Sequence, residues 1–241
     1  MHRLYFMGSS AANASAHAII DKRVNKNNGA ERGREMLTLY LAGGCFWGVQ
    51  KYFDQFRGVE STEVGYANGP DKVRLNLAEG AGVTGTSGAE DVWEEYVFSE
   101  TEPPYYETVC AGIGYAETVK VVYDPAVLPT KMLLGYYFDV IDPLAVNRQG
   151  PDVGVQYRTG IFYEEAAADE LLPVIQEVVK EKEAQAGQPL ATEVAPLHNY
   201  YPAEEYHQKY LEKRPFGYCH IPKRFFFRQY AMDKEEEEGV K

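Results

Sequence analysis

The fold is decided by six residues, Gly43-Gly44-Cys45-Phe46-Trp47-Gly48, which separate two different apolar patterns. Before them, Leu37, Leu39 and Leu41 recur at period two, which predicts a strand with one buried side. After them, apolar residues recur at helical spacing and Gly58 provides a helix stop; these residues are Val49, Tyr52, Phe53 and Phe56. The glycines are therefore expected in a turn, with Cys45 at a helix N-terminus.

This position predicts a reactive thiol. Free N–H groups and the helix dipole at a helix N-terminus stabilise an anion, so we expect Cys45 to lose its proton easily. The resulting thiolate would be the nucleophile, and Phe46 and Trp47 beside it predict an apolar contact surface. A lone cysteine after two glycines is also commonly a small buried hydrophobe, so the residues alone leave both interpretations open.

Composition limits the class of protein. The chain has 241 residues and a net charge of −12, and a surface this acidic argues against binding nucleic acid. No run of about 18 apolar residues occurs, which argues against a membrane span. The three cysteines, Cys45, Cys110 and Cys219, are widely spaced, which favours catalytic thiols in a reducing compartment over a disulfide framework. The five histidines show no paired ligand spacing, which argues against a metal site.

The remaining patterns alternate irregularly between strand and helix, which predicts an α+β domain. We expect strands over 118–123, 154–163 and 190–196, and a short hairpin at 92–98. We expect helices over 164–185, interrupted at Pro173, and over 202–213, opened by Pro202. Another helix is predicted to bury one face, formed by Met132, Leu133, Tyr136, Tyr137 and Val140.

Five motifs, in order over residues 37–220, resemble those of the A-type peptide methionine sulfoxide reductases. They are Gly44–Gly48, Gly65–Gly69, Tyr115–Glu117 with Val121–Pro125, Asn147–Gly150 with Asp152 and Gln156–Arg158, and Pro202–Gln208. The resemblance implies a two-layer α/β sandwich with a mixed β-sheet and a ferredoxin-like core. It also implies an enzyme that reduces methionine-S-sulfoxide, free or in proteins, and so repairs oxidative damage.

The resemblance divides the chain into three parts. Residues 37–222 would form the reductase domain, with an acidic and glycine-rich insert over about 70–104 that carries eight acidic and two basic residues. Residues 1–36 are expected to be a disordered or targeting extension, and residues 223–241 a C-terminal tail whose acidic end, 235–238, is solvated. The implied location is the cytoplasm, or an organelle if residues 1–36 are a targeting segment. Tyr115 stands where the family usually has histidine, which could alter the reach of Glu117.

Reduction of a sulfoxide needs a nucleophile for the sulfur and an acid for the oxygen. The resemblance implies Cys45 as the nucleophile and Glu117 as the acid, with a pKa raised by its apolar neighbours, for which Phe46 and Trp47 are the candidates. The other implied site residues are Tyr106, Asp152 and Tyr157 around the oxygen, and Phe46, Trp47, Tyr210 and Tyr218 around the substrate.

Attack would leave Cys45 as a sulfenic acid, which a second thiol converts to a disulfide. The resemblance implies Cys219 as this resolving cysteine and a structural role for Cys110. It implies no cofactor, with thioredoxin or dithiothreitol as the reductant, and a monomer that acts on oxidised proteins or free methionine sulfoxide. Two alternatives remain open: a non-catalytic sulfoxide-binding or scaffold relative, which would bind oxidised peptides without releasing methionine, and a thiol peroxidase, which would consume peroxide without sulfoxide turnover.

Overall fold

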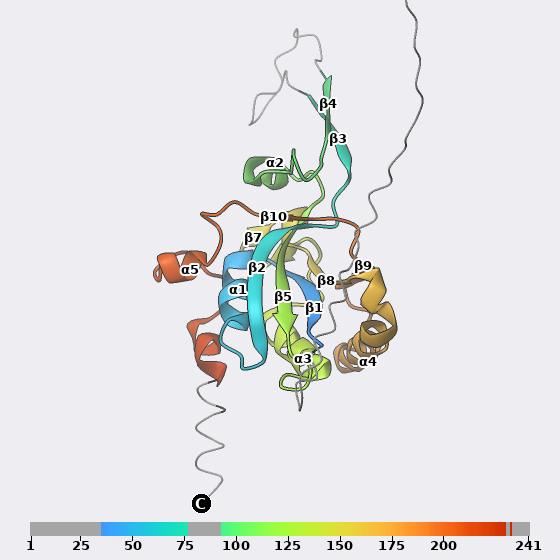
Figure 1. The fold of residues 1–241 in the computed structure, drawn as a ribbon, viewed down its shortest axis with the longest axis vertical. Helices are drawn as coiled ribbons and strands as arrows, with labels where there is room; N and C mark the ends of the chain where they lie inside the picture. The colour runs from blue at the N-terminus through green and yellow to red at the C-terminus, as the bar shows by residue number, and fades with distance from the viewer. Residues whose placement is uncertain (1–34, 77–92, 230–231, 233–241) are drawn as a thin grey trace, which may run out of the picture. The chain divides into compact units, whose positions relative to one another are not determined.

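A computed structural model of the chain describes residues 35–76, 93–229 and 232 (Figure 1). Its main sheet is built from β1 (Leu37–Gly43), β2 (Val59–Ala67), β5 (Ala116–Tyr123), β8 (Thr159–Tyr163), β9 (Glu193–Pro196) and β10 (Tyr200–Pro202). The strands lie in the order β10-β2-β5-β1-β8-β9. All neighbours are antiparallel except β8 and β9, which are parallel, so the sheet is mixed as predicted.

Two helices complete the central unit, α1 (Phe46–Phe53) and α3 (Thr130–Val140). Along the chain, β1, α1, β2, β5, α3 and β8 follow the β-α-β-β-α-β order of a ferredoxin-like unit, with β5 and β1 in the middle of its four strands. Helix α1 packs against β2 and β5, and α3 packs against β1, which gives the second layer (Figure 1). Helix α4 (Ala168–Ala186) packs against α3 and β8.

The two patterns beside the glycines form the predicted elements. Leu37, Leu39 and Leu41 of β1 are at most 6% exposed, and the four predicted apolar residues of α1 and its end are at most 3% exposed. Each such buried apolar side chain contributes roughly 1.5–3 kcal/mol to folding. One residue of the face predicted for α3 is misplaced, because Met132 is 45% exposed while its neighbour Leu133 is fully buried.

The predicted helix over 202–213 is wrong. Pro202 ends strand β10, where it pairs with Gly65, and α5 spans only Tyr210–Lys213. The Ala203 N–H donates to the Val64 carbonyl, and the Gln208 side chain bonds both backbone groups of Val64. Pairing along the edge of β2 therefore outweighs the local preference of proline for a first helical turn.

Other boundaries also differ from the prediction, and the strand expected over 190–196 begins only at Glu193. The segment 154–163 begins with a 3₁₀ turn, Val155–Tyr157, and only Thr159–Tyr163 forms a strand. Helix α4 continues through Pro173 after a 3₁₀ turn at Glu165–Ala167, because Leu171, Ile175 and Val178 on its inner face are buried in the core. Tertiary packing thus keeps the helix intact despite the missing proline N–H.

The short hairpin predicted at 92–98 is wrong, because residues 93–97 form a single strand that pairs with an earlier segment of the insert. Strand β4 (Trp93–Val97) pairs with β3 (Lys72–Asn76), and residues 77–92 lie outside the described residues. The Phe98 ring packs on Tyr115 with centroids 5.6 Å apart, and the Tyr115 hydroxyl donates to the Pro70 carbonyl at 2.8 Å. Tyr115 therefore anchors the base of the insert.

Residues beyond 222 pack on the central unit. The 3₁₀ turn Lys223–Phe227 places Phe225 against Tyr52, with ring centroids 6.2 Å apart, and the Arg228 N–H donates to the Gln55 side chain. The predicted acidic end of the tail, 235–238, and the extension 1–34 lie outside the described residues. Within the described part of the chain, no helix has the length and apolarity needed to cross a membrane.

Candidate active site

Cys45 caps the N-terminus of α1, as the sequence predicts. The turn before it needs glycine at position 44, where φ is +82° and a methyl group would lie 2.5 Å from Gln149 Cβ. The Cys45 side chain is only 6% exposed. The strand-turn-helix unit therefore fixes the sulfur at the end of a buried helix.

Glu117 reaches the same helix end from the neighbouring strand β5. Its side chain is 1% exposed, and its Oε2 accepts a 3.0 Å hydrogen bond from the N–H of Phe46, the residue after Cys45. Burial raises the pKa of Glu117 to about 8, the Phe46 N–H opposes that rise, and the negative charge of Asp152 adds to it. The carboxyl group therefore holds a proton at neutral pH, beside the thiol.

The predicted acidity of Cys45 is wrong. Burial raises the pKa of the Cys45 thiol well above its usual value, and the charges of Glu117 and Asp152 add to this rise. The Trp47 N–H lowers it, as expected at a helix N-terminus, but this effect is smaller than the cost of burying an anion. The sequence predicts that the Phe46 N–H is free to stabilise the thiolate, but in the structure it donates to Glu117 instead.

Aromatic side chains line the region around Cys45. Trp47 is partly exposed, and its ring stacks on Tyr210 with centroids 3.8 Å apart. Phe46 is 1% exposed and its ring packs against Tyr66 and His207. Of the two aromatics after the cysteine, Trp47 therefore presents surface to a ligand, while Phe46 belongs mainly to the wall behind it.

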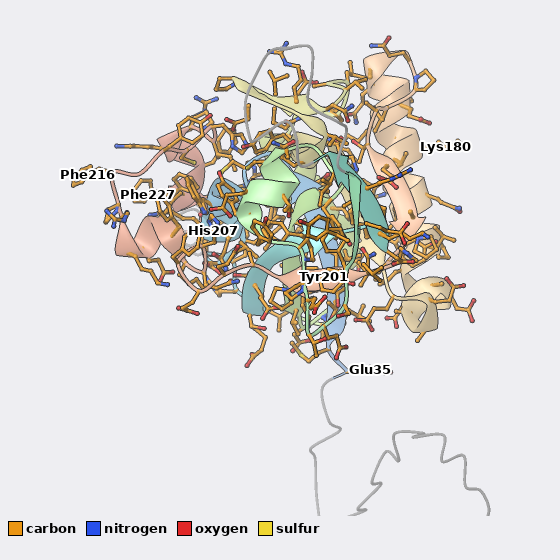
Figure 2. All side chains as sticks on the ribbon, turned by 90° about the horizontal axis from the view of Figure 1, so that it is seen from above. Glu35, Lys180, Tyr201, His207, Phe216 and Phe227 are labelled. Carbon is orange, nitrogen blue, oxygen red and sulfur yellow. The ribbon has the colours of Figure 1, made fainter. Side chains whose placement is uncertain are left out.

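His207 and Glu204 were not predicted as site residues, although both lie in the quoted motif Pro202–Gln208. His207, which Figure 2 labels, is 1% exposed. Its Nδ1 accepts a 2.9 Å hydrogen bond from the Trp47 indole N–H. Burial lowers the pKa of His207, which favours the neutral ring. Because Nδ1 accepts the indole N–H, the ring carries its proton on Nε2, which faces Glu204 at 3.8 Å. Glu204 in turn accepts bonds from the Tyr66 hydroxyl and the Tyr106 N–H.

The three residues predicted around the substrate oxygen come from separate elements. Tyr106 begins α2 (Tyr106–Cys110), and its ring lies 4.6 Å from His207. Tyr157 ends the 3₁₀ turn before β8, and burial together with the charges of Glu117 and Cys45 raises its pKa. Asp152 lies in the short pair β6 (Arg148–Gln149) and β7 (Asp152–Val153), and accepts a 2.8 Å bond from the Tyr218 hydroxyl.

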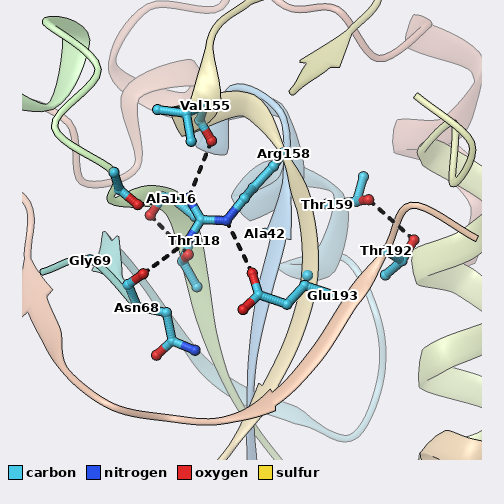
Figure 3. Close-up of polar contacts among 12 residues, drawn as sticks. Ala42, Asn68, Gly69, Ala116, Thr118, Val155, Arg158, Thr159, Thr192 and Glu193 are labelled. Carbon is cyan, nitrogen blue, oxygen red and sulfur yellow. Dashed lines mark hydrogen bonds and ion pairs between the residues drawn. The ribbon is translucent and has the colours of Figure 1, made fainter. Parts of the chain in front are cut away.

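Arg158 also lies in a quoted motif, and no role was predicted for it either (Figure 3). Its guanidinium donates to the carbonyls of Gly114 at 2.9 Å and Asn68 at 3.0 Å, and to Glu193 at 3.1 Å. It therefore joins the start of β8, next to Tyr157, to the loop that leads into Glu117.

The described thiols are all unpaired. Cys219 lies close to α1, since a methyl group at Gly48 would be 2.8 Å from its sulfur. Gly48 is three residues after Cys45, on the same helix face, so the two thiols approach one side of α1. Cys110 is exposed and lies beside the Tyr106 hydroxyl. No cluster of residues suited to a metal ion occurs among the described residues.

Known proteins resemble this chain over most of its length. Residues 37–74 and 81–238 match the family model for peptide methionine sulfoxide reductase. The chain belongs to the peptide methionine sulfoxide reductase family. Peptide methionine sulfoxide reductase MsrA of Lachnoclostridium phytofermentans is 45% identical over 186 residues, which cover 76% of this chain and 92% of that protein. The relative of the same name from Clostridium acetobutylicum is 43% identical, over 78% of this chain and 96% of its own.

Solved structures of the family share the fold. Methionine sulfoxide reductase A of Corynebacterium diphtheriae matches with a TM-score of 0.57 and 30% identity, over 81% of this chain and 87% of that one. Mxr1 from Saccharomyces cerevisiae in reduced form also matches with a TM-score of 0.57, at 32% identity, over 76% of this chain and 88% of that one. The reductase family and its α+β fold, both expected from the motifs, are thus confirmed.

Proposed function

We propose that this reductase acts on methionine-S-sulfoxide, free or in proteins, with Cys45 as nucleophile and Glu117 as proton donor. The observation that carries the proposal is the bond between the Glu117 carboxyl group and the Phe46 N–H, which holds the acid one residue from the nucleophilic sulfur. A carboxyl group with a pKa of about 8 is protonated at neutral pH, as the acid must be.

In the first step the Cys45 sulfur attacks the sulfoxide sulfur while Glu117 protonates the oxygen. The proton released by the Cys45 thiol returns to Glu117. The protonated oxygen then passes from the substrate sulfur to the Cys45 sulfur: the substrate S–O bond and the bond between the two sulfurs break, and a Cys45 S–O bond forms. Methionine leaves, and Cys45 holds the oxygen as a sulfenic acid. Trp47, stacked on Tyr210, would contact the substrate methyl group, and the Tyr106 and Tyr157 hydroxyls would bond its oxygen without adding charge.

In the second step Cys219 condenses with the sulfenic acid, which gives a disulfide and water. Thioredoxin would then reduce the disulfide by thiol–disulfide exchange, and no prosthetic group is required. The position of the Cys219 sulfur, on the same side of α1 as Cys45, supports this order of events.

The test is steady-state reduction of the two sulfoxide epimers, with dithiothreitol and with the thioredoxin system in separate assays. We expect turnover of the S-epimer alone with either reductant, and none in Cys45→Ser. Cys219→Ser should lose more turnover with thioredoxin than with dithiothreitol, because dithiothreitol can reduce a sulfenic acid directly. Equal turnover of both epimers, or activity in Cys45→Ser, would contradict the proposal.

A further inference from the structure

Helix α1 has a gap where the resolving thiol lies. Any side chain at Gly48 would occupy this space, since its Cβ would lie 2.8 Å from Cys219 Sγ and 3.3 Å from Ile221 Cδ1. Real Cβ atoms almost never come so close to another atom, so the glycine is what lets the Cys219 segment rest on the helix.

The residues on both sides of Cys219 face one carboxylate. Tyr218 donates its hydroxyl to Asp152 Oδ1 at 2.8 Å, and His220 Nδ1 lies 3.8 Å from Asp152 Oδ2. Burial lowers the pKa of His220, while the charge of Asp152 and the nearby Gly43 carbonyl oppose that lowering. The segment is thus set against the turn that leads into the catalytic cysteine.

The contact between His220 and Asp152 is longer than a hydrogen bond. The side chain is 5% exposed, and neither ring nitrogen has a hydrogen-bond partner among the described residues; Asp152 Oδ2 is likewise buried and unpaired. Leaving such groups unsatisfied is costly, and a shift of about 1 Å would bring the nitrogen and the oxygen within bonding distance. The same shift would move the thiol between Tyr218 and His220.

We propose that His220 is a positioning residue for the resolving step, which rests on the function proposed above: it closes on Asp152 and so places Cys219 for attack on the oxidised Cys45. In that step the Cys219 sulfur forms a bond to the Cys45 sulfur. The S–O bond of the sulfenic acid breaks, and the hydroxyl leaves as water with the proton of the Cys219 thiol. His220 takes no part in the bond changes.

The test separates the two steps in a single turnover without added reductant. Methionine release reports the first step. Disulfide formation is reported by the loss of free thiols, which is measured by mass spectrometry of samples quenched at successive times. His220→Phe keeps a ring of similar size and removes both nitrogens, while His220→Asn keeps a donor near the position of Nδ1. Since a misplacement of about 1 Å can slow a step by about 100-fold, we expect His220→Phe to slow disulfide formation at least tenfold more than methionine release.

The conservative variant should recover a substantial part of the lost rate, which a purely structural role would not predict. Melting curves of both variants check folding, and His220→Asn alone decides the outcome if His220→Phe is unfolded: it should slow the disulfide step more than release. Equal slowing of both steps, or no slowing of either, would overturn the role of His220. Failure of the unmodified enzyme to release methionine would instead overturn the proposed function.

Discussion

Replacing Glu117 by glutamine tests the buried acid through stability as well as activity. The folded-state pKa of about 8 is raised from 4.5, so between these values the folded chain keeps a proton that the unfolded chain has lost. The stability from this group is therefore full below about pH 4.5 and is lost as the pH rises towards 8, at about 1.4 kcal/mol per pH unit. Glu117 is 1% exposed, so little solvent screening reduces this effect.

Glutamine does not titrate, so Glu117→Gln should lack this part of the pH dependence. From about pH 6 to about pH 8 the unfolding free energy of the unmodified chain should fall by roughly 2–3 kcal/mol relative to the variant. Urea unfolding at both pH values measures this difference, and turnover should fall by about 100-fold or more in the variant because the acid is gone. A stability difference that is the same at both pH values would refute the raised pKa.

Three further substitutions address the surroundings of the site. Gly48→Ala should slow disulfide formation, measured by thiol loss, because its methyl group would lie 2.8 Å from the Cys219 sulfur. A rate like that of the unmodified chain would count against the gap. Trp47→Phe should raise KM several-fold in steady-state assays, since it loses the bond to His207 and part of a ring stack that contributes about 0.5–1.5 kcal/mol. An unchanged KM would place the substrate elsewhere. Arg158→Lys should lower the unfolding free energy, measured by urea unfolding, by about 2 kcal/mol, because one ammonium group cannot replace the several donors of the guanidinium. Full stability in the variant would show that these hydrogen bonds are dispensable.

The sequence predicted those parts of the fold that depend on local pattern. Alternation in β1 and helical spacing in α1 are both preserved because the same residues fill the core. The helix expected after Pro202 failed for the opposite reason. Its residues bond to Val64, some 140 positions earlier in the chain, and no local pattern records that partner.

The site shows the same division. Local spacing predicted that Cys45 lies at a helix N-terminus. It did not predict the burial and the nearby carboxylate that raise the pKa of Cys45. The bonds of His207 to Trp47, and of Glu204 to Tyr66, join positions far apart in the sequence. The motif Pro202–Gln208 marked both residues without indicating a role, because their function follows from burial and from partners that only the fold brings together.

The account depends on Cys45 taking the oxygen from the substrate. The direct measurement uses Cys219→Ser with an excess of methionine-S-sulfoxide and no reductant, a sulfenic-acid trap such as dimedone, and mass spectrometry of the digested protein. We predict release of one methionine per chain and a single trapped adduct, on Cys45. Methionine release with the adduct on Cys110, or with no adduct on any cysteine, would contradict the account.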